Sequence, residues 1–124
     1  MSQITIDMLD DIAAGAAFLA TGGGGDPHLA CLCAKEGLNQ YGPANLIAPE
    51  ELSDDAFVIA VGGVGAPTTS LELLPSVDEA ARVVEAYGDI IGKKPDAIVS
   101  FEIGGANSRI PLVASAALYF PMIF

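Results

Sequence analysis

The 124-residue sequence has few basic residues. Five Lys and Arg stand against 16 Asp and Glu, which gives a formal net charge of −11. A nucleic-acid-binding protein needs clustered basic side chains to replace the counterions on phosphates, and an anionic membrane surface attracts the same kind of cluster. The sequence therefore excludes a nucleic-acid partner and disfavours binding to an anionic membrane.

Long hydrophobic runs are absent as well. A membrane-spanning helix needs about 20 apolar residues. The two longest apolar segments are Ile12–Ala20, which is interrupted by Gly15, and Ile110–Phe124, which contains Pro111 and Pro121. The N-terminus also lacks the basic start and apolar core of a secretory signal. We therefore predict a cytoplasmic protein without a membrane partner.

Cysteine and histidine are scarce too. Cys31 and Cys33 lie two residues apart in a predicted helix, and side chains at that spacing point in nearly opposite directions. A disulfide bond or a shared metal ion is therefore disfavoured, and we expect two buried thiols. His28 is the only histidine, so no Ser-His-Asp or Cys-His catalytic set can be assembled.

The residues that are abundant indicate a folded domain. Hydrophobic residues make up 52% of the sequence and charged residues 17%, against a typical charged share of about 25%. A disordered chain needs the opposite balance. Since a domain has roughly 150 residues, we expect residues 1–124 to form one domain.

Hydrophobic periodicity predicts the α/β class. Two helices lead the chain, and its second half then alternates strands and helices, which implies parallel pairing through right-handed crossovers. We expect a small, mostly parallel sheet of about four strands with helices packed on it. The predicted helices cover residues 6–20, 27–36 and 110–118 and a segment behind a Ser76–Glu79 capping box, and the predicted strands cover Asn45–Ala48, Ala56–Val61, Ala97–Phe101 and Pro121–Phe124.

The C-terminal segment is unusually hydrophobic. From Ile110 to Phe124 it carries no charge and ends on an apolar strand. We interpret this as a domain that is incomplete at its C-terminus, or one that buries this end against another chain.

Three glycine-bearing segments are expected to meet at one edge of the sheet. Gly22–Gly25 precedes a predicted helix, while Gly62–Thr69 and Glu102–Ser108 follow predicted strands. Parallel sheets bind ligands at the carboxyl ends of their strands, and helix N-termini present free N–H groups. Neither nucleotide-binding pattern is present, since no Lys-Ser or Lys-Thr follows Gly65 and Thr68 stands where the dinucleotide pattern needs Gly or Ala.

Carboxylates near these segments are candidates for acid–base chemistry. Glu102 follows an apolar strand directly, and partial desolvation there would raise its pKa and suit it to proton transfer. Acceptance of N–H bonds from its own loop is an equal alternative. Asp26 is expected to cap a helix and His28 to lie at the surface. If a metal ion bound, its ligands would be Asp26, His28, Glu72 and Glu102, although no local histidine spacing supports such a site.

The residues after Glu102 offer hydrogen bonds. Asn107 and Ser108 are neutral, and either fits the cap of the next helix. Arg109 is the only base near a candidate loop and has the chemistry to clamp a carboxylate or an oxyanion. We nevertheless expect it to be a surface residue in the first turn of a helix.

Three blocks taken together resemble the N-terminal domain of the S-methyl thiohydantoin desulfurase family, also called DUF917, which is related to hydantoinases and oxoprolinases. The blocks are Thr21–Pro27, Gly65–Thr68 with Glu72 nearby, and Glu102–Ser108 before an Ala-rich helix. The resemblance covers nearly the whole chain in the same order. It implies a cytoplasmic α/β domain of a longer two-domain protein that hydrolyses a cyclic imide or releases thiol from an S-methyl thiohydantoin.

The resemblance also implies a set of site residues and a mechanism. Water would add to C2 of the ring, with Glu102 or Asp26 as general base, while loop N–H groups and Asn107 hold the developing negative charge. It implies neither a defined cofactor nor a defined metal. The implied catalytic residues are Glu102, Asp26 and Glu72, and the implied substrate-binding residues are Gly24, Gly25, Thr68, Gly104, Gly105 and Asn107.

The sequence departs from the family pattern at two places. The family continues past the last strand into an acidic, Gly-Arg-containing motif and a second domain, whereas this sequence stops at Phe124. Arg109 stands where we expect an apolar residue. These departures argue against independent catalysis by the 124 residues. The alternative is a non-catalytic module that binds a small anion or a partner chain, with an exposed C-terminal apolar patch and self-association; the expected partners are a homo-oligomer or a missing C-terminal domain.

Overall fold

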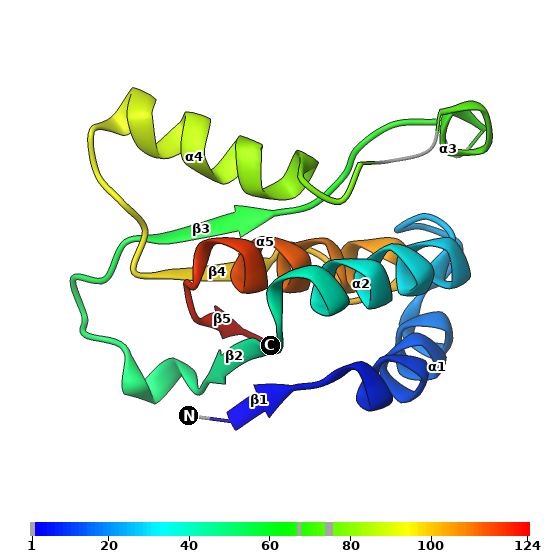
Figure 1. Ribbon diagram of the computed structural model, residues 1–124, viewed down its shortest axis with the longest axis horizontal. Coiled ribbons are helices and arrows are strands. Elements are labelled where there is room, and N and C mark those ends of the chain that lie inside the picture. Colours follow the sequence, from blue (N-terminus) through cyan, green and yellow to red (C-terminus); the bar gives the residue numbers. More distant parts are fainter. Residues whose placement is uncertain (1, 67, 74–75) are drawn as a thin grey trace.

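The computed structural model describes residues 2–66, 68–73 and 76–124. Within these ranges the strands form one five-stranded sheet in the order β1-β2-β5-β4-β3 (Figure 1). The strand β1 pairs antiparallel with β2, and the other neighbours pair in parallel. The strands are β1 (Ser2–Ile4), β2 (Ala44–Ile47), β3 (Val58–Val61), β4 (Ala97–Ser100) and β5 (Met122–Ile123).

The helices pack around a central helix, α5, whose residues 111–116 are all buried. Leu112, Val113 and Ala116 of α5 join one hydrophobic cluster with α2 and with strands β1, β2 and β5, while Ala114 joins a second cluster with α4, β3 and β4. The helices are α1 (Leu9–Leu19), α2 (Pro27–Tyr41), α3 (Thr69–Glu72), α4 (Glu79–Ile91) and α5 (Ile110–Leu118), with short 3-10 turns η1 (Ile6–Met8), η2 (Pro49–Glu51) and η3 (Gly105–Ser108).

The small, mostly parallel α/β sheet predicted from the sequence is confirmed, with one strand more than expected. The additional strand, β1, lies at the N-terminus and is antiparallel to its neighbour. At three residues it is too short to show a period of two, which is why hydrophobic periodicity did not identify it.

The apolar C-terminal stretch has a simple structural explanation. Strand β5 is the central strand of the sheet, between β2 and β4, and Met122 is fully buried. Met122 packs against α5 and α2 in one hydrophobic cluster, and Ile123 on the other face of the strand is half-buried. The expected exposed apolar patch at the C-terminus is therefore wrong for the buried helix α5 and for Met122.

Helix α2 is longer than predicted. It continues through Gly37, where we expected it to stop, as far as Tyr41. A Cβ atom at position 37 would lie 2.8 Å from a methyl carbon of Val113 on α5. Gly37 thus allows two helices to approach closely and does not end a helix.

Helix α4 buries less of its apolar stripe than predicted. Val84 is fully buried against β3 and β4, whereas Val83, Tyr87, Ile90 and Ile91 are exposed. Only half of the predicted capping box forms. Glu79 Oε1 accepts a hydrogen bond from the Ser76 N–H at 3.1 Å, whereas Ser76 Oγ accepts from Asp78, which is the residue at the N-cap of α4. Part of the apolar face of α4 is therefore left uncovered in this chain.

Candidate functional site

Two of the glycine-bearing segments are joined by backbone hydrogen bonds. The carbonyl of Gly24 accepts from the N–H groups of Ala106 at 2.6 Å and Asn107 at 3.2 Å. Gly24 has a φ of +80°, and a Cβ there would lie 2.4 Å from the carbonyl oxygen of Gly104. Only glycine fits this conformation and this approach, so the Gly22–Gly25 segment is shaped by its contact with the loop after β4.

Asn107 joins the third segment to this pair. Its Oδ1 accepts a hydrogen bond from the Gly63 N–H at 2.7 Å, and its Nδ2 donates to Glu102 Oε2 at 2.9 Å. The side chain is held firmly, because Asn107 is only 3% exposed and its own carbonyl accepts from Ser100 Oγ at 3.0 Å. The loops that follow β3 and β4 and the segment before α2 therefore meet, as the parallel topology predicted.

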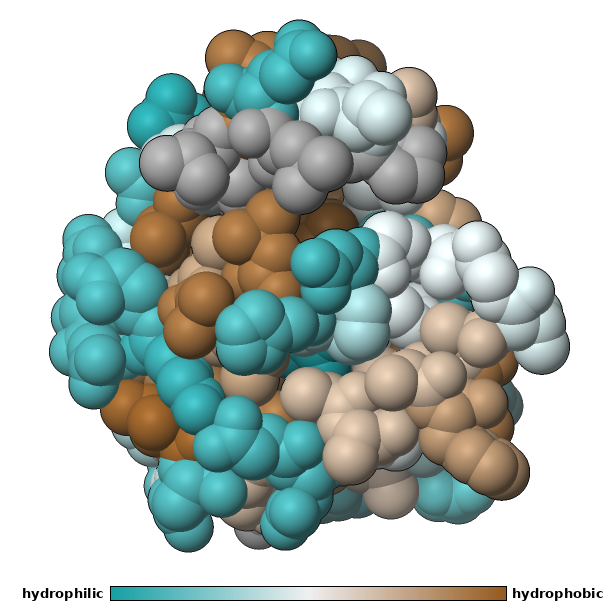
Figure 2. Space-filling view, turned by 90° about the vertical axis from the view of Figure 1, so that its right-hand side faces the viewer, coloured by the Kyte–Doolittle hydropathy of each residue, from teal (hydrophilic) through white to brown (hydrophobic). Residues whose placement is uncertain are grey.

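These three segments surround a groove with a volume of about 820 Å³. Glu102 Oε1 lies against the glycine backbone, 3.1 Å from where a Cβ of Gly24 would be. Figure 2 views the molecule from this end, where hydrophobic and near-neutral residues share the surface with hydrophilic ones. The groove is lined by residues of α1, of the three segments and of α5: Ala17, Ala20, Gly22–Gly25, Pro27, Gly63–Ala66, Thr69, Phe101, Glu102, Ala106, Asn107 and Ile110.

Four of the predicted site residues thus line one groove: Glu102, Asn107, Gly24 and Gly25. Two more, Gly104 and Gly105, are buried directly behind it. A Cβ at Gly105 would lie 2.6 Å from Gly24 backbone atoms, and one at Gly104 would lie 2.9 Å from Ala20 Cα. Gly104 and Gly105 therefore let the backbone segments pack together and do not face the groove themselves.

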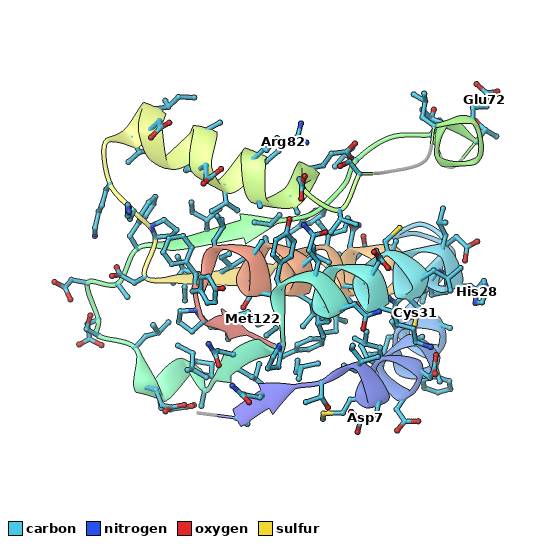
Figure 3. All side chains as sticks on the ribbon, viewed as in Figure 1. Asp7, His28, Cys31, Glu72, Arg82 and Met122 are labelled. Carbon is cyan, nitrogen blue, oxygen red and sulfur yellow. The ribbon has the colours of Figure 1, made fainter. Side chains whose placement is uncertain are left out.

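The other predicted site residues are not brought to the groove. Glu72 lies on α3 and is exposed, and Figure 3 shows it far from His28, which lies near the start of α2. Thr68 is exposed just before α3 and does not line the groove. Asp26 caps α2 by accepting from the His28 N–H at 2.8 Å, as expected. Pro67 of the second motif block lies outside the described residues.

The candidate metal set is not assembled. Among the residues that the structure describes, no three His, Cys, Asp or Glu side chains are grouped so that they would hold a metal ion. The same residues include no helix that is long and apolar enough to cross a membrane.

Arg109 was expected at the surface, and this expectation is wrong. The side chain is 1% exposed, and Nη2 donates to the carbonyls of Pro27 at 2.7 Å and Gly105 at 3.0 Å. Burial lowers the pKa of the guanidinium, against the opposing effect of Cys31 and Asp26. The local sequence around Arg109 does not indicate that the side chain is buried. The burial results from contact with α2, which is far away in the sequence.

Ser108 and Asn107 are not side-chain caps of α5. Ser108 is buried and its Oγ donates to the Gly105 carbonyl at 3.1 Å, while the Asn107 amide is engaged by Glu102 and Gly63. Their hydrogen bonds stabilise the loop after β4, and neither side chain caps the first turn of α5.

The two cysteines are free thiols, as predicted. Cys31 is buried, and its Sγ lies 3.5 Å from Leu9 O and from Asp10 Oδ1. Cys33 is only half-buried on α2, so the expectation of two buried thiols is correct for Cys31 and wrong for Cys33. Burial is the main cause that raises the pKa of each thiol, with a further contribution from Asp10 at Cys31 and from Glu79 at Cys33.

Comparison with known proteins identifies a family model and a solved structure of the same fold. A family model described as "S-Me-THD-like, N-terminal domain" matches residues 7–123. A crystal structure of a protein from Chromobacterium violaceum has the same fold, with a TM-score of 0.79 and 19% sequence identity. The superposition covers 99% of this chain and 34% of that one, so the chain spans about a third of its solved relative. A search of curated proteins finds no match.

Proposed function

The chain belongs to the S-Me-THD-like family, whose N-terminal domain it matches over residues 7–123, and on this basis we propose that its groove binds a five-membered cyclic imide or an S-methyl thiohydantoin. The observation that carries the proposal is the placement of Glu102. Its carboxylate lies in the groove, between the glycine segment and the buried amide of Asn107. A cytoplasmic location remains a prediction from the sequence.

Glu102 is the group best placed to act as general base. Asn107 Nδ2 donates a hydrogen bond to Glu102 Oε2. Glu102 Oε1 has no hydrogen-bond partner within the described residues and faces Gly23 and Gly24. A carboxylate fixed through one oxygen retains the other to take a proton from water. Asp26, the other candidate base, does not line the groove and is committed to capping α2.

The proposed reaction is hydrolysis at C2 of the ring. Glu102 takes a proton from water as the water oxygen bonds to C2, and the electron pair of the C2=N double bond moves to the ring nitrogen. The bond between C2 and sulfur then breaks as the carbonyl of hydantoin forms. One water proton ends on the ring nitrogen and the other on the leaving thiolate, so that S-methyl thiohydantoin and water give hydantoin and methanethiol. The Asn107 amide positions Glu102, and N–H groups of the glycine segment stabilise the developing negative charge.

Full activity is proposed to need more than this chain. The groove is open, and its lining includes apolar side chains in contact with water, such as Val64 (94% exposed) and Phe101 (51%). Catalysis of this kind benefits from the exclusion of water. Because the solved relative is about three times as long, we propose that a further domain, or a second copy of the chain, covers the groove.

Thiol release from S-methyl thiohydantoin tests the proposal. It is measured for the 124-residue chain and for a longer form that carries a further domain. General-base catalysis typically contributes about 10²- to 10⁴-fold, so Glu102→Gln is expected to lower release by the active form at least about 100-fold. Glu72→Gln is the matched control, because Glu72 is exposed on α3, and it is expected to leave the rate unchanged. Absence of release from both forms would reject the enzymatic proposal.

A partner-binding module is the second candidate function. The exposed Val83, Tyr87 and Ile90 on α4 favour it, because monomeric proteins rarely leave a contiguous apolar helix face uncovered. Size-exclusion chromatography of the isolated chain separates the candidates. A stable monomer at high protein concentration counts against self-association.

A further inference from the structure

A second pocket lies beside the groove and has a volume of about 220 Å³. It shares Gly25, Ala106 and Ile110 with the groove. Its remaining wall is largely apolar and comes from three helices. These lining residues are Asp26, Leu29, Ala30, Cys33 and Ala34 around α2, Ser76, Val77, Glu79 and Ala80 around α4, and Arg109 and Val113 around α5.

Arg109 lines this pocket, and two of its three guanidinium nitrogens lack hydrogen-bond partners. The side chain is 1% exposed, and neither Nε nor Nη1 has a partner in the described structure. These two nitrogens carry three of the five N–H groups of a guanidinium. Buried donors are almost always satisfied, and a buried charge without partners is strongly destabilising. Hydrogen bonds to the carbonyls of Pro27 and Gly105 anchor Nη2, which leaves Nε and Nη1 for another acceptor.

The backbone around the pocket also favours an anion. Helices α2, α4 and α5 all begin beside it, at Pro27, Glu79 and Ile110. Each helix start presents the positive end of a helix dipole. The His28 and Glu79 N–H groups are already bonded to Asp26 and to the Ser76 carbonyl, and Pro27 and Pro111 carry no N–H. The three dipole ends and the Arg109 guanidinium together offset the carboxylates of Asp26 and Glu79, which line the same pocket.

We propose that this pocket binds a small monocarboxylate with a short apolar body, whose carboxylate pairs with Arg109. The apolar lining provides contact for the body of the ligand. A volume of about 220 Å³ corresponds to roughly seven water molecules at about 30 Å³ each, which is space for a ligand of about seven non-hydrogen atoms. Nε and Nη1 are closed to bulk water, so binding includes a rotation of the guanidinium towards the ligand.

The charges at the rim select against more highly charged anions. The carboxylates of Asp26 and Glu79 line the same pocket, and each already accepts a backbone hydrogen bond at a helix start. They repel a dianion such as phosphate more strongly than a monoanion. A single buried cation is therefore matched by a single carboxylate.

Isovalerate, with seven non-hydrogen atoms, is the probe that tests the proposal on the 124-residue chain. Saturable binding is measured by calorimetry and by backbone amide NMR, with an expected dissociation constant of about 10 mM or tighter. Isovaleramide has the same shape without the charge and is expected to bind at least about tenfold more weakly. Equal binding of the two, saturable binding of phosphate only, or no saturable binding would each overturn the proposal.

A matched pair of variants locates the charge. Arg109→Met keeps an unbranched apolar stem, removes the guanidinium and is expected to weaken isovalerate binding at least about tenfold. Arg82→Met removes a surface arginine of α4, whose side chain is 68% exposed, and is expected to leave binding unchanged. Similar effects of both variants would contradict the role of Arg109.

Cys33 provides a readout that needs no variant. It lines the pocket, whereas Cys31 is not among the lining residues and is buried. Isovalerate is expected to slow iodoacetamide labelling of Cys33, located by mass spectrometry, and isovaleramide at the same concentration is not. Unchanged labelling under saturating isovalerate would overturn the proposal even if Arg109→Met does not fold.

The proposal is independent of hydrolysis in the neighbouring groove. Binding is measured without turnover, and Glu102 does not line this pocket. Glu102→Gln is therefore expected to lower thiol release at least about 100-fold and to retain isovalerate binding, so each proposal can fail without the other.

Discussion

At the scale of single residues, Asn107 is the side chain that creates the groove. It accepts from the Gly63 N–H and donates to Glu102, so that one buried amide sets the distance between two loops. The sequence identified Asn107 as a hydrogen-bonding residue but not as the link between the loops. That role depends on the sheet bringing positions 63 and 107 together, and no local pattern encodes it.

Gly24 is the residue whose substitution should affect the groove most directly. Gly24→Ala places an L-residue at a φ of +80° and a Cβ 2.4 Å from the Gly104 carbonyl oxygen. Gly22→Ala meets a φ of +99° but open space. We expect a loss of unfolding free energy of about 1–2 kcal/mol for Gly22→Ala and about 2–4 kcal/mol for Gly24→Ala. Urea unfolding measures both, and equal losses would mean that Gly24 and Gly104 are not in contact.

Cys31 should make stability depend on alkaline pH. Burial and Asp10 raise the pKa of its thiol above the ordinary value of 9.0. The folded state therefore retains a proton that the unfolded state has lost, and stability declines as pH rises from about 9 through the raised pKa. Cys31→Ala is expected to reduce this decline in urea unfolding series between about pH 8 and 11. An unchanged slope would show that Cys31 does not cause the decline.

At the scale of secondary structure, the sequence predicted most elements and missed those set by tertiary contacts. Helix α5 was predicted at its observed bounds, Ile110–Leu118, because Pro111 and an apolar run define it locally. The end of α2 was misplaced because Gly37 looks like a helix terminus, whereas its role depends on Val113. The outer face of α4 was assigned to the core because hydrophobic periodicity identifies the apolar side of a helix. It does not indicate how much of that side the neighbouring elements cover.

Two helical glycines provide a prediction for the packing of helices. A Cβ at Gly15 of α1 would have nothing within 4 Å, whereas a Cβ at Gly37 of α2 would lie 2.8 Å from Val113. Gly15→Ala is expected to stabilise the chain by about 0.5–1 kcal/mol, because alanine has the higher helix propensity. Gly37→Ala is expected to destabilise it by about 1–3 kcal/mol through overpacking. Thermal unfolding checks both, and stabilisation by Gly37→Ala would mean that α2 and α5 are not closely packed.

At the scale of the whole molecule, the parallel sheet places the candidate site residues at one end of the molecule. Strands β3 and β4 deliver their loops to the end at which α2, α4 and α5 begin (Figure 1). Pairing parallel strands through helices produces this juxtaposition, so the meeting of the loops followed from topology before any side chain was considered. The exclusion of Glu72 and Thr68 from the groove did not follow, because the direction of the loop after β3 is set by tertiary packing.

The proposed function requires that the three glycine-bearing segments form one binding site for a five-membered ring. Titration of the chain with hydantoin, followed by backbone amide NMR, tests this requirement without any need for turnover. We expect saturable shifts at Gly22–Gly25, Gly63–Ala66 and Phe101–Asn107 together, with one shared dissociation constant. Shifts confined to one of these segments, or none at saturating hydantoin, would contradict a shared site.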